Sequence, residues 1–209
     1  MANTLLIEIV ESEEALVDLL EAVPGIKIQL EPGRVGENTA YARKTIAEKL
    51  RTAQDLLPKG VVFVINDAWR PRVAQERYFN YYLDKVSKAQ PDWSHEKAYR
   101  EAAKFAIPPT EIYRAGHMTG AAIDVQLMRN GRRLPMQSRS LNFAQRATTD
   151  SPQLQPYIDR NRQLLLDVMT KVGLVNYPRE YWHFSYGDVM WAEYTGSSRA
   201  IYGVIEKTP

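Results

Sequence analysis

The sequence contains no cysteine among its 209 residues. Disulfide bonds and thiolate metal sites are therefore excluded, and any metal ion has to be held by histidine and carboxylate side chains. Histidine is also scarce, because His95, His117 and His183 are the only three in the chain. A metal site that uses imidazoles consequently has very few ligands to choose from.

An excess of one charge and a long apolar run are absent as well. The 27 basic and 25 acidic residues are interspersed and give a formal net charge of +2. This balance predicts no nucleic-acid partner and no anionic membrane surface. The first twenty residues lack a basic start, and no apolar run approaches the ~20 residues that a membrane span requires. We therefore expect a cytoplasmic protein.

Hydrophobic residues make up 44% of the sequence, which allows a sizeable core, and the length predicts most simply one domain over residues 1–209. Periodicity and turn signals predict strands at 25–30, 61–65, 120–128 and 180–187, and helices at 39–58, 71–90, 94–106 and 156–173. Asn130 and Gly131 predict a tight turn, and a polar loop is expected over 132–155. Strands and helices do not alternate regularly. This order predicts an α+β fold with a small, mostly antiparallel sheet flanked by helices.

The stretch AGHMTGAAIDVQL, residues 115–127, combines a histidine with a carboxylate. His117 lies in a turn flanked by glycines, and Asp124 interrupts an apolar run. Burying a carboxylate is costly unless it is paired or binds a metal, so a salt bridge to an arginine and a metal site both remain open. His95 is different, because it is expected in the exposed first turn of a helix that starts at Ser94.

The string REYWHF, residues 179–184, supplies a second imidazole at His183. Together with His117 and Asp124 it would give two nitrogen ligands and one oxygen ligand. Such a donor set leaves a fourth tetrahedral position for water, which is typical of catalytic rather than structural zinc. The pattern therefore predicts one zinc ion per chain, at the sheet.

Glu180 stands three residues before His183 and is placed to take a proton from a water on that metal. In a regular strand, residues at this odd spacing face opposite sides of the sheet. We therefore expect Glu180 in the turn after Pro178, curling toward the metal from the entrance of the strand. A surface glutamate paired with Arg179 is the alternative.

A hydrolytic metal site that attacks a carbonyl also needs a cation where negative charge develops on the carbonyl oxygen. Arg70 follows the 61–65 strand and is fixed by Pro71, so it is well placed to stabilise that charge. Arg72 is expected to be a solvated residue at the start of a helix. Asp67 could orient Arg70 or bind substrate, although a turn or capping role is also typical of aspartate at this position.

The combined motifs resemble a known family. His117, Gly120, Ala122 and Asp124, followed about 60 residues later by the Glu-Tyr-Trp-His string at 180–183, are similar to the VanX-like D-alanyl-D-alanine dipeptidases of the zinc peptidase family M15. DAWRP at 67–71 resembles the aromatic-Arg-Pro segment of that family. The resemblance covers roughly residues 60 to 190.

The resemblance implies a specific role for each matching residue. His117, Asp124 and His183 would hold zinc, Glu180 would act as general base and acid, and Arg70 would stabilise the transition state. The reaction implied is hydrolysis of a D,D-dipeptide, a small peptide substrate, with release of D-alanine. Cytoplasmic members of the family lack a signal peptide, and none is expected at the start of this sequence.

Two departures from the family pattern lie near the expected substrate position. Ala115 stands where the pattern usually has serine, and residues 132–150 are basic up to Asp150 where close relatives carry an acidic stretch. Both leave the identity of the dipeptide open. A D,D- or L,D-carboxypeptidase acting on cell-wall peptides is one alternative. A non-catalytic metal-binding relative is another, although such a module would need neither Glu180 nor Arg70.

Overall fold

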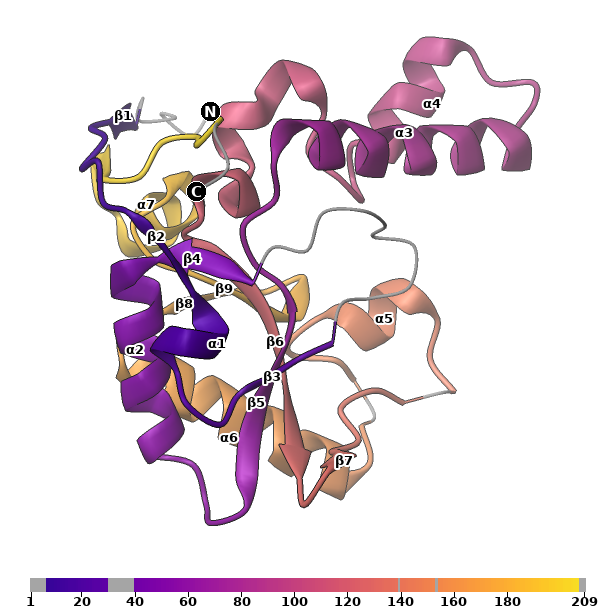
Figure 1. Cartoon of the computed structure of the whole chain (residues 1–209). Coiled ribbons are helices and arrows are strands. Elements are labelled where there is room, and N and C mark those ends of the chain that lie inside the picture. The colour runs from indigo at the N-terminus through magenta and orange to yellow at the C-terminus, as the bar shows by residue number, and fades with distance from the viewer. Residues whose placement is uncertain (1–6, 30–39, 139, 153, 207–209) are drawn as a thin grey trace.

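The computed structural model describes residues 7–29, 40–138, 140–152 and 154–206 (Figure 1). Its centre is a six-stranded sheet in which only one pair of neighbours, β3 with β5, runs parallel. The strand order is β3 (Lys27–Ile28), β5 (Val61–Asp67), β6 (Ala122–Arg129), β9 (Glu180–Ser185) and β8 (Val175–Tyr177), with β7 (Arg132–Arg133) pairing beside β6. The predicted α+β class with a mostly antiparallel sheet is confirmed.

The central strands β5 and β6 follow directly from their sequences. Phe63, Val64 and Ile65 of β5 are fully buried, as expected for a short continuous apolar run inside a sheet. The turn after β6 uses Asn130 and Gly131, whose φ angles of 49° and 79° are both left-handed. This geometry matches the strand twist and explains the Asn-Gly pair, so the predicted turn is confirmed.

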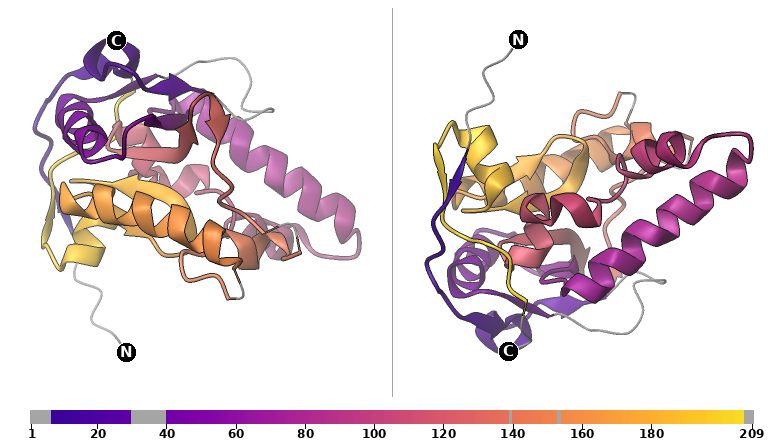
Figure 2. Two further views of the ribbon diagram at one scale, coloured as in Figure 1. Left: turned by 90° about the horizontal axis from the view of Figure 1, so that it is seen from below. Right: turned by 90° about the horizontal axis from the view of Figure 1, so that it is seen from above.

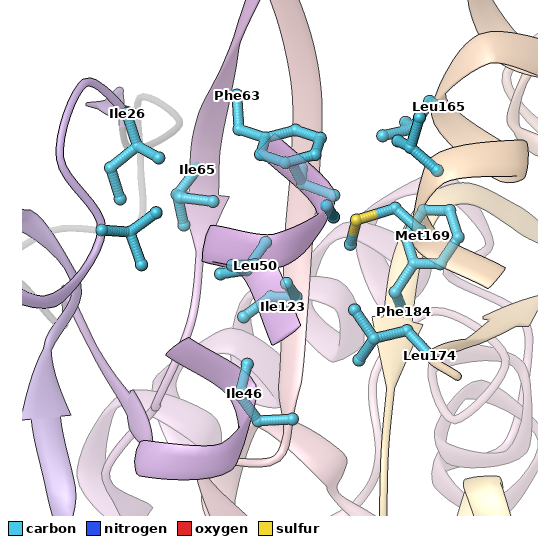
Figure 3. Packing of buried hydrophobic residues seen from close by; sticks show 14 of the residues in the cluster. Ile26, Ile46, Leu50, Phe63, Ile65, Ile123, Leu165, Met169, Leu174 and Phe184 are labelled. Atoms are coloured by element: carbon cyan, nitrogen blue, oxygen red, sulfur yellow. The ribbon is translucent and has the colours of Figure 1, made fainter. Parts of the chain in front are cut away.

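Two long helices share one apolar core with the sheet. Helix α2 (Lys44–Asp55) contributes Ile46 and Leu50, and helix α6 (Pro156–Lys171) contributes Leu165 and Met169. Their side chains gather around sheet residues that include Phe63, Ile123 and Phe184, as Figure 3 shows. Pro156 begins α6 and Gly173, with a φ of 82°, follows its end, both as predicted.

The structure corrects the start of α2. The helix was expected from residue 39, but the chain over Tyr41–Arg43 forms β4, which pairs with β2 (Leu16–Asp18). The helix therefore begins at Lys44. Thr39, the predicted cap, lies outside the described residues.

Helices α3 (Arg72–Ala89) and α4 (His95–Ala102) form an arm that projects from the sheet (Figures 1 and 2). The buried face of α3 centres on Gln75 and Phe79, and Tyr78, Tyr82 and Val86 pack against Phe79 and the buried residues around it. Ser94 caps α4 as expected. The helix ends four residues before the predicted end, where Phe105 turns back to stack on Tyr82 with ring centroids 5.3 Å apart.

The predicted loop over 132–155 contains a short helix, α5 (Phe143–Ala147). The Asn142 side chain accepts a hydrogen bond from the Gln145 backbone nitrogen, and the Gln145 side chain accepts one from the Asn142 backbone nitrogen. This reciprocal cap supplies the start signal that the sequence interpretation missed. The remaining elements are β1 (Glu8–Ile9), α1 (Leu19–Ala22), η1 (Pro109–Arg114), η2 (Gly116–Thr119), α7 (Val189–Thr195) and β10 (Arg199–Ala200).

The N-terminal segment that contains Glu11 and the C-terminal segment that contains Gly203 meet at the buried guanidinium of Arg43. Its nitrogens donate to the Thr119 backbone oxygen at 2.8 Å, to the Glu11 carboxylate at 2.9 Å and to the Gly203 backbone oxygen at 3.2 Å. The side chain therefore connects three distant parts of the chain, and one of them is the η2 turn. Within the described part of the chain, no helix is long and apolar enough to cross a membrane.

Glu14 attaches the same N-terminal segment to the rest of the fold. Its carboxylate accepts hydrogen bonds from the backbone and hydroxyl of Thr45 and from the Tyr202 hydroxyl at 2.7 Å. Burial acts to raise the pKa of Glu14, but these hydrogen bonds outweigh it and leave the pKa below its ordinary value. A folded-state pKa below the unfolded one contributes stability above the unfolded pKa, and this contribution is lost as the pH falls through the folded value.

We expect Glu14→Gln to reduce the free energy of unfolding by about 1–2 kcal/mol at pH 7. The loss should be clearly smaller at pH 3, because the wild-type carboxylate is then increasingly protonated. Urea unfolding at both pH values measures this difference. Exposed Glu13→Gln serves as the control, and an equal loss for Glu14→Gln at the two pH values would contradict the assignment.

Candidate metal centre

Pairing of strands β6 and β9 brings two of the predicted ligands together. In the antiparallel register Asp124 lies directly opposite His183, although 59 residues separate them in the sequence. The His183 Nδ1 and Asp124 Oδ1 atoms are 2.9 Å apart. The contact is therefore a cross-strand pair, which the backbone of two central strands holds in place (Figure 1).

The third predicted ligand, His117, lies in η2, the turn that precedes β6. The Nδ1 atom of His117 lies 2.8 Å from the Ala68 backbone oxygen, which can only accept a hydrogen bond. Nδ1 is consequently a protonated nitrogen, and Nε2 is the ring nitrogen that faces Asp124 and could bind a metal ion. That Nε2 lies 3.3 Å from Asp124 Oδ1. Gly120, with a φ of 69°, ends the turn so that the chain can enter β6.

One potential ligand atom from each of His117, Asp124 and His183 lies within 4.8 Å of the others. His117 and Asp124 are buried, and the side chain of His183 is 11% exposed. Two imidazole nitrogens and one carboxylate oxygen are a donor set that suits zinc with an open coordination position. The arrangement thus fits a catalytic metal, and it places the group at the sheet as the sequence predicted.

Burial, charge and hydrogen bonds within this group shift the pKa values of Asp124 and His183. Burial alone would raise the pKa of Asp124, but the charge of His117 and hydrogen bonds with both imidazoles hold it well below the usual value. Burial acts to lower the pKa of His183, and the hydrogen bond and charge of Asp124 prevail and raise it. A carboxylate anion is therefore stabilised although it is buried within the sheet.

Glu180 lies beside this group. It is the first residue of β9 rather than part of a preceding turn, which corrects the sequence expectation. Its Oε2 atom is 4.0 Å from His183 Nδ1, and one third of its side chain is exposed. The register between β8 and β9 is irregular at this point, so the simple alternation of faces does not apply.

Arg70 is held in place next to His117. Its backbone nitrogen donates to the His117 oxygen at 3.0 Å. Its guanidinium forms a buried ion pair with Asp67, donates to Gln75 Oε1 at 2.7 Å and lies 4.6 Å from the ring centre of Tyr78. Asp67 therefore does orient Arg70, in addition to accepting a local turn hydrogen bond from the next backbone nitrogen.

The other two candidates from the sequence lie apart from this group. Arg72 forms an ion pair with Glu206 at the surface, and His95 is exposed in the first turn of α4. Both positions agree with the expectations for a helix start.

Sequence reasoning missed two residues near the ligands. The ring of Tyr177 meets His183 edge to face with centroids 6.0 Å apart, and burial raises the pKa of its hydroxyl. Asp188 is buried and accepts hydrogen bonds from Ser185 and from the backbone of Trp191, where it caps α7. A Cβ atom at Gly116 would lie 2.4 Å from Asp188 Oδ2, so any residue larger than glycine would collide with this carboxylate. The capping position of Asp188 was the one signal in the sequence that could have identified it.

The family model described as D-Ala-D-Ala dipeptidase, Peptidase M15, matches residues 34–198 of this chain. The chain belongs to this family of metallopeptidases. The match includes His117, Asp124, Glu180 and His183, and it also includes Arg70.

Two curated relatives are similar over most of the chain. A D-alanyl-D-alanine dipeptidase of Synechocystis sp. is 26% identical over 170 residues, which is 71% of this chain and 68% of that protein. A D-alanyl-D-alanine dipeptidase of Escherichia coli (strain K12) is 27% identical over 180 residues, covering 81% and 83%. Among solved structures, the LdcB LD-carboxypeptidase has a similar fold, with a TM-score of 0.51, 21% identity, and coverage of 88% of this chain and 73% of that one.

Metal affinity tests the three ligands. We expect His183→Ala to weaken zinc binding at least about 100-fold, because one of three protein ligands is lost. His95→Ala is the matched control, since that imidazole is exposed on α4, and it should bind zinc as the wild type does. Competition with a chromophoric chelator measures both affinities. Wild-type affinity in the His183→Ala variant would contradict the ligand assignment.

Proposed function

We propose that this chain is a zinc-dependent dipeptidase that hydrolyses D-alanyl-D-alanine or a related D-amino-acid dipeptide. His117, Asp124 and His183 hold one zinc ion per chain. The observation that carries the proposal is the convergence of these three ligand atoms within 4.8 Å, with the Glu180 carboxylate beside them. The substrate class is supported by the family match and by the names of the two curated relatives.

A zinc ion held by His117, Asp124 and His183 would polarise the substrate carbonyl and would lower the pKa of water at the site toward about 7. Glu180 accepts the proton of the attacking water as the water oxygen bonds to the carbonyl carbon. The C–O bond forms, the C–N bond breaks, and Glu180 passes the proton to the leaving amine. Partial exposure of Glu180 gives it access to both water and substrate.

Arg70 stabilises the negative charge that develops on the carbonyl oxygen. Asp67, Gln75 and Tyr78 fix its guanidinium before substrate arrives, so little reorganisation is needed during the reaction. A lysine could not reproduce this arrangement, because it lacks the planar fork that binds two partners at once.

The substrate is a small peptide, and its exact side chains depend on residues near Ala115 and in the 132–150 segment. Ala115 is buried directly before the η2 turn that carries His117. It offers no hydroxyl at that point. The name of the LD-carboxypeptidase with a similar fold keeps cell-wall peptides as the competing substrate class. A cytoplasmic location stays a prediction of the sequence.

A substrate panel distinguishes these classes. The purified zinc-loaded chain is incubated with D-alanyl-D-alanine, with L-alanyl-L-alanine and with a muropeptide pentapeptide, and released alanine of either configuration is measured. We expect rapid hydrolysis of the D,D-dipeptide alone. Preferential cleavage of the pentapeptide would replace the dipeptidase proposal by a carboxypeptidase, and turnover of none would remove both.

In the same assay Glu180→Gln should lose turnover by about 1000-fold or more while keeping stoichiometric zinc, because the variant lacks the proton acceptor. Glu96→Gln is the control, since Glu96 is an exposed residue paired with Arg100 on α4. Near wild-type turnover in Glu180→Gln would exclude Glu180 from proton transfer.

Arg70→Lys should reduce kcat/KM by roughly 100-fold or more, since a charge-stabilising donor held in place is lost. Arg72→Lys provides a matched comparison two residues away, because Arg72 pairs with Glu206 at the surface. That variant should stay within about twofold of the wild type. Steady-state kinetics on both variants, with circular dichroism to verify folding, measures the difference. Equal effects at the two positions would remove the role assigned to Arg70.

A further inference from the structure

The β8–β9 pair carries an irregularity beside the metal-ligand group. Asn176 pairs with Phe184, but the next residue on β8, Tyr177, pairs with Glu180. In a regular antiparallel ladder Tyr177 would face His183. Residues 181–183 are therefore extra residues of β9 relative to β8, and His183 is one of them.

This irregularity has a chemical consequence. Alternation along a strand would direct Glu180 and His183 to opposite faces of the sheet. The bulge changes that phase, and the two side chains come within 4.0 Å of each other. The proposed base and a proposed metal ligand can therefore act on one substrate only because the strand is irregular between them.

The side chain of Asn176 spans the bulge from β8. Its amide nitrogen Nδ2 lies 3.2 Å from the Glu180 backbone oxygen, 3.4 Å from that of Tyr181 and 3.0 Å from that of His183. The Tyr181 and His183 oxygens belong to residues that lie between paired positions of the β8–β9 ladder, and the Glu180 oxygen belongs to the residue at which the bulge begins. One amide group thus replaces ladder hydrogen bonds that the irregular backbone cannot form.

Thr149 fixes the orientation of this amide. Its hydroxyl lies 2.5 Å from Asn176 Oδ1, and its backbone nitrogen donates to the Pro178 oxygen at 2.9 Å. The Thr149 hydroxyl donates to Oδ1, so Nδ2 is directed at the bulge. Inversion of the amide would place an oxygen against the backbone carbonyls of Glu180 and His183.

The backbone just before Thr149 is held in turn by a buried arginine. The guanidinium of Arg162, on α6, donates to the backbone oxygens of Met136 at 2.7 Å, Arg146 at 2.5 Å and Thr148 at 2.7 Å. The side chain is only 4% exposed. The segment after β7 is therefore anchored to α6 immediately before the residue that orients Asn176.

We propose that Asn176 is a positioning residue that, oriented by Thr149, holds the β9 bulge in the form that sets Glu180 and His183 on the same side. Asn176 acts through the backbone of those two residues. The proposal deepens the proposed function and rests on it for its kinetic consequence. Its consequence for metal binding, through His183, can be measured whether or not the chain hydrolyses a dipeptide.

Asn176→Asp keeps the size of the side chain and replaces the donor by an oxygen. We expect kcat for D-alanyl-D-alanine to fall about 100-fold with KM changed less than about threefold, because a small displacement of the base affects the reaction more than binding. Zinc affinity should fall by about 10-fold, since the support behind His183 is weakened. Asn161→Asp is the matched control, because the Asn161 amide also donates to a backbone oxygen, that of Pro135, away from the bulge.

A milder pair of variants keeps the test decisive if Asn176→Asp does not fold. Thr149→Val removes the hydroxyl that orients the amide and should lower kcat by roughly 10-fold, whereas Thr149→Ser retains the hydroxyl and should restore it. A bulge residue with a purely structural role would change the unfolding midpoint without this split between kcat and KM or this rescue.

The outcomes separate the two proposals. If the wild type hydrolyses no D,D-dipeptide but zinc affinity falls in Thr149→Val and recovers in Thr149→Ser, the dipeptidase assignment is wrong and the positioning role stands. If the wild type is active and the Thr149→Val and folded Asn176→Asp variants match it in both kcat and zinc affinity, the role of Asn176 is overturned.

Discussion

The structure depends on a buried carboxylate. Asp124 lies on a central strand of the sheet, and isolated burial of its charge would be strongly unfavourable. Two imidazoles compensate, one across the strand pair from β9 and one from the turn before β6. Because removal of either imidazole would leave a buried charge poorly paired, the three side chains form one unit. That unit requires β6 and β9 to be neighbours, and it requires η2 to turn back toward Ala68.

Regular pairing of β6 with β9 holds Asp124 opposite His183. Irregular pairing on either side places Asp67 and Glu180 beside them. The register between β5 and β6 shifts next to Asp67, which orients Arg70. The register between β8 and β9 shifts next to Glu180. Bulges redirect side chains without interrupting the sheet, and they occur frequently beside active sites. The β6–β9 pairing is therefore regular where it joins Asp124 to His183, and the pairings on either side of it are irregular where partner side chains change direction.

Much of the molecule was predictable from local patterns. The apolar run of β5, the Asn-Gly turn and the proline and glycine that bound α6 each depend on residues adjacent in sequence. The predictions that were wrong concern competition from distant segments. Residues 41–43 were assigned to a helix but pair with β2. Glu180 was expected in a turn because simple alternation was the only available rule.

The sequence by itself determined the chemistry that is possible. Without cysteine, and with only three histidines, one of them at a helix start, the candidate metal ligands were nearly settled by residue type. Only the tertiary structure decided that His117, Asp124 and His183 converge, that Asp67 and Gln75 hold Arg70, and that Asn176 bridges a bulge. Convergence depends on strand order and register, which arise from packing between segments far apart in the chain, and no local pattern encodes those distances.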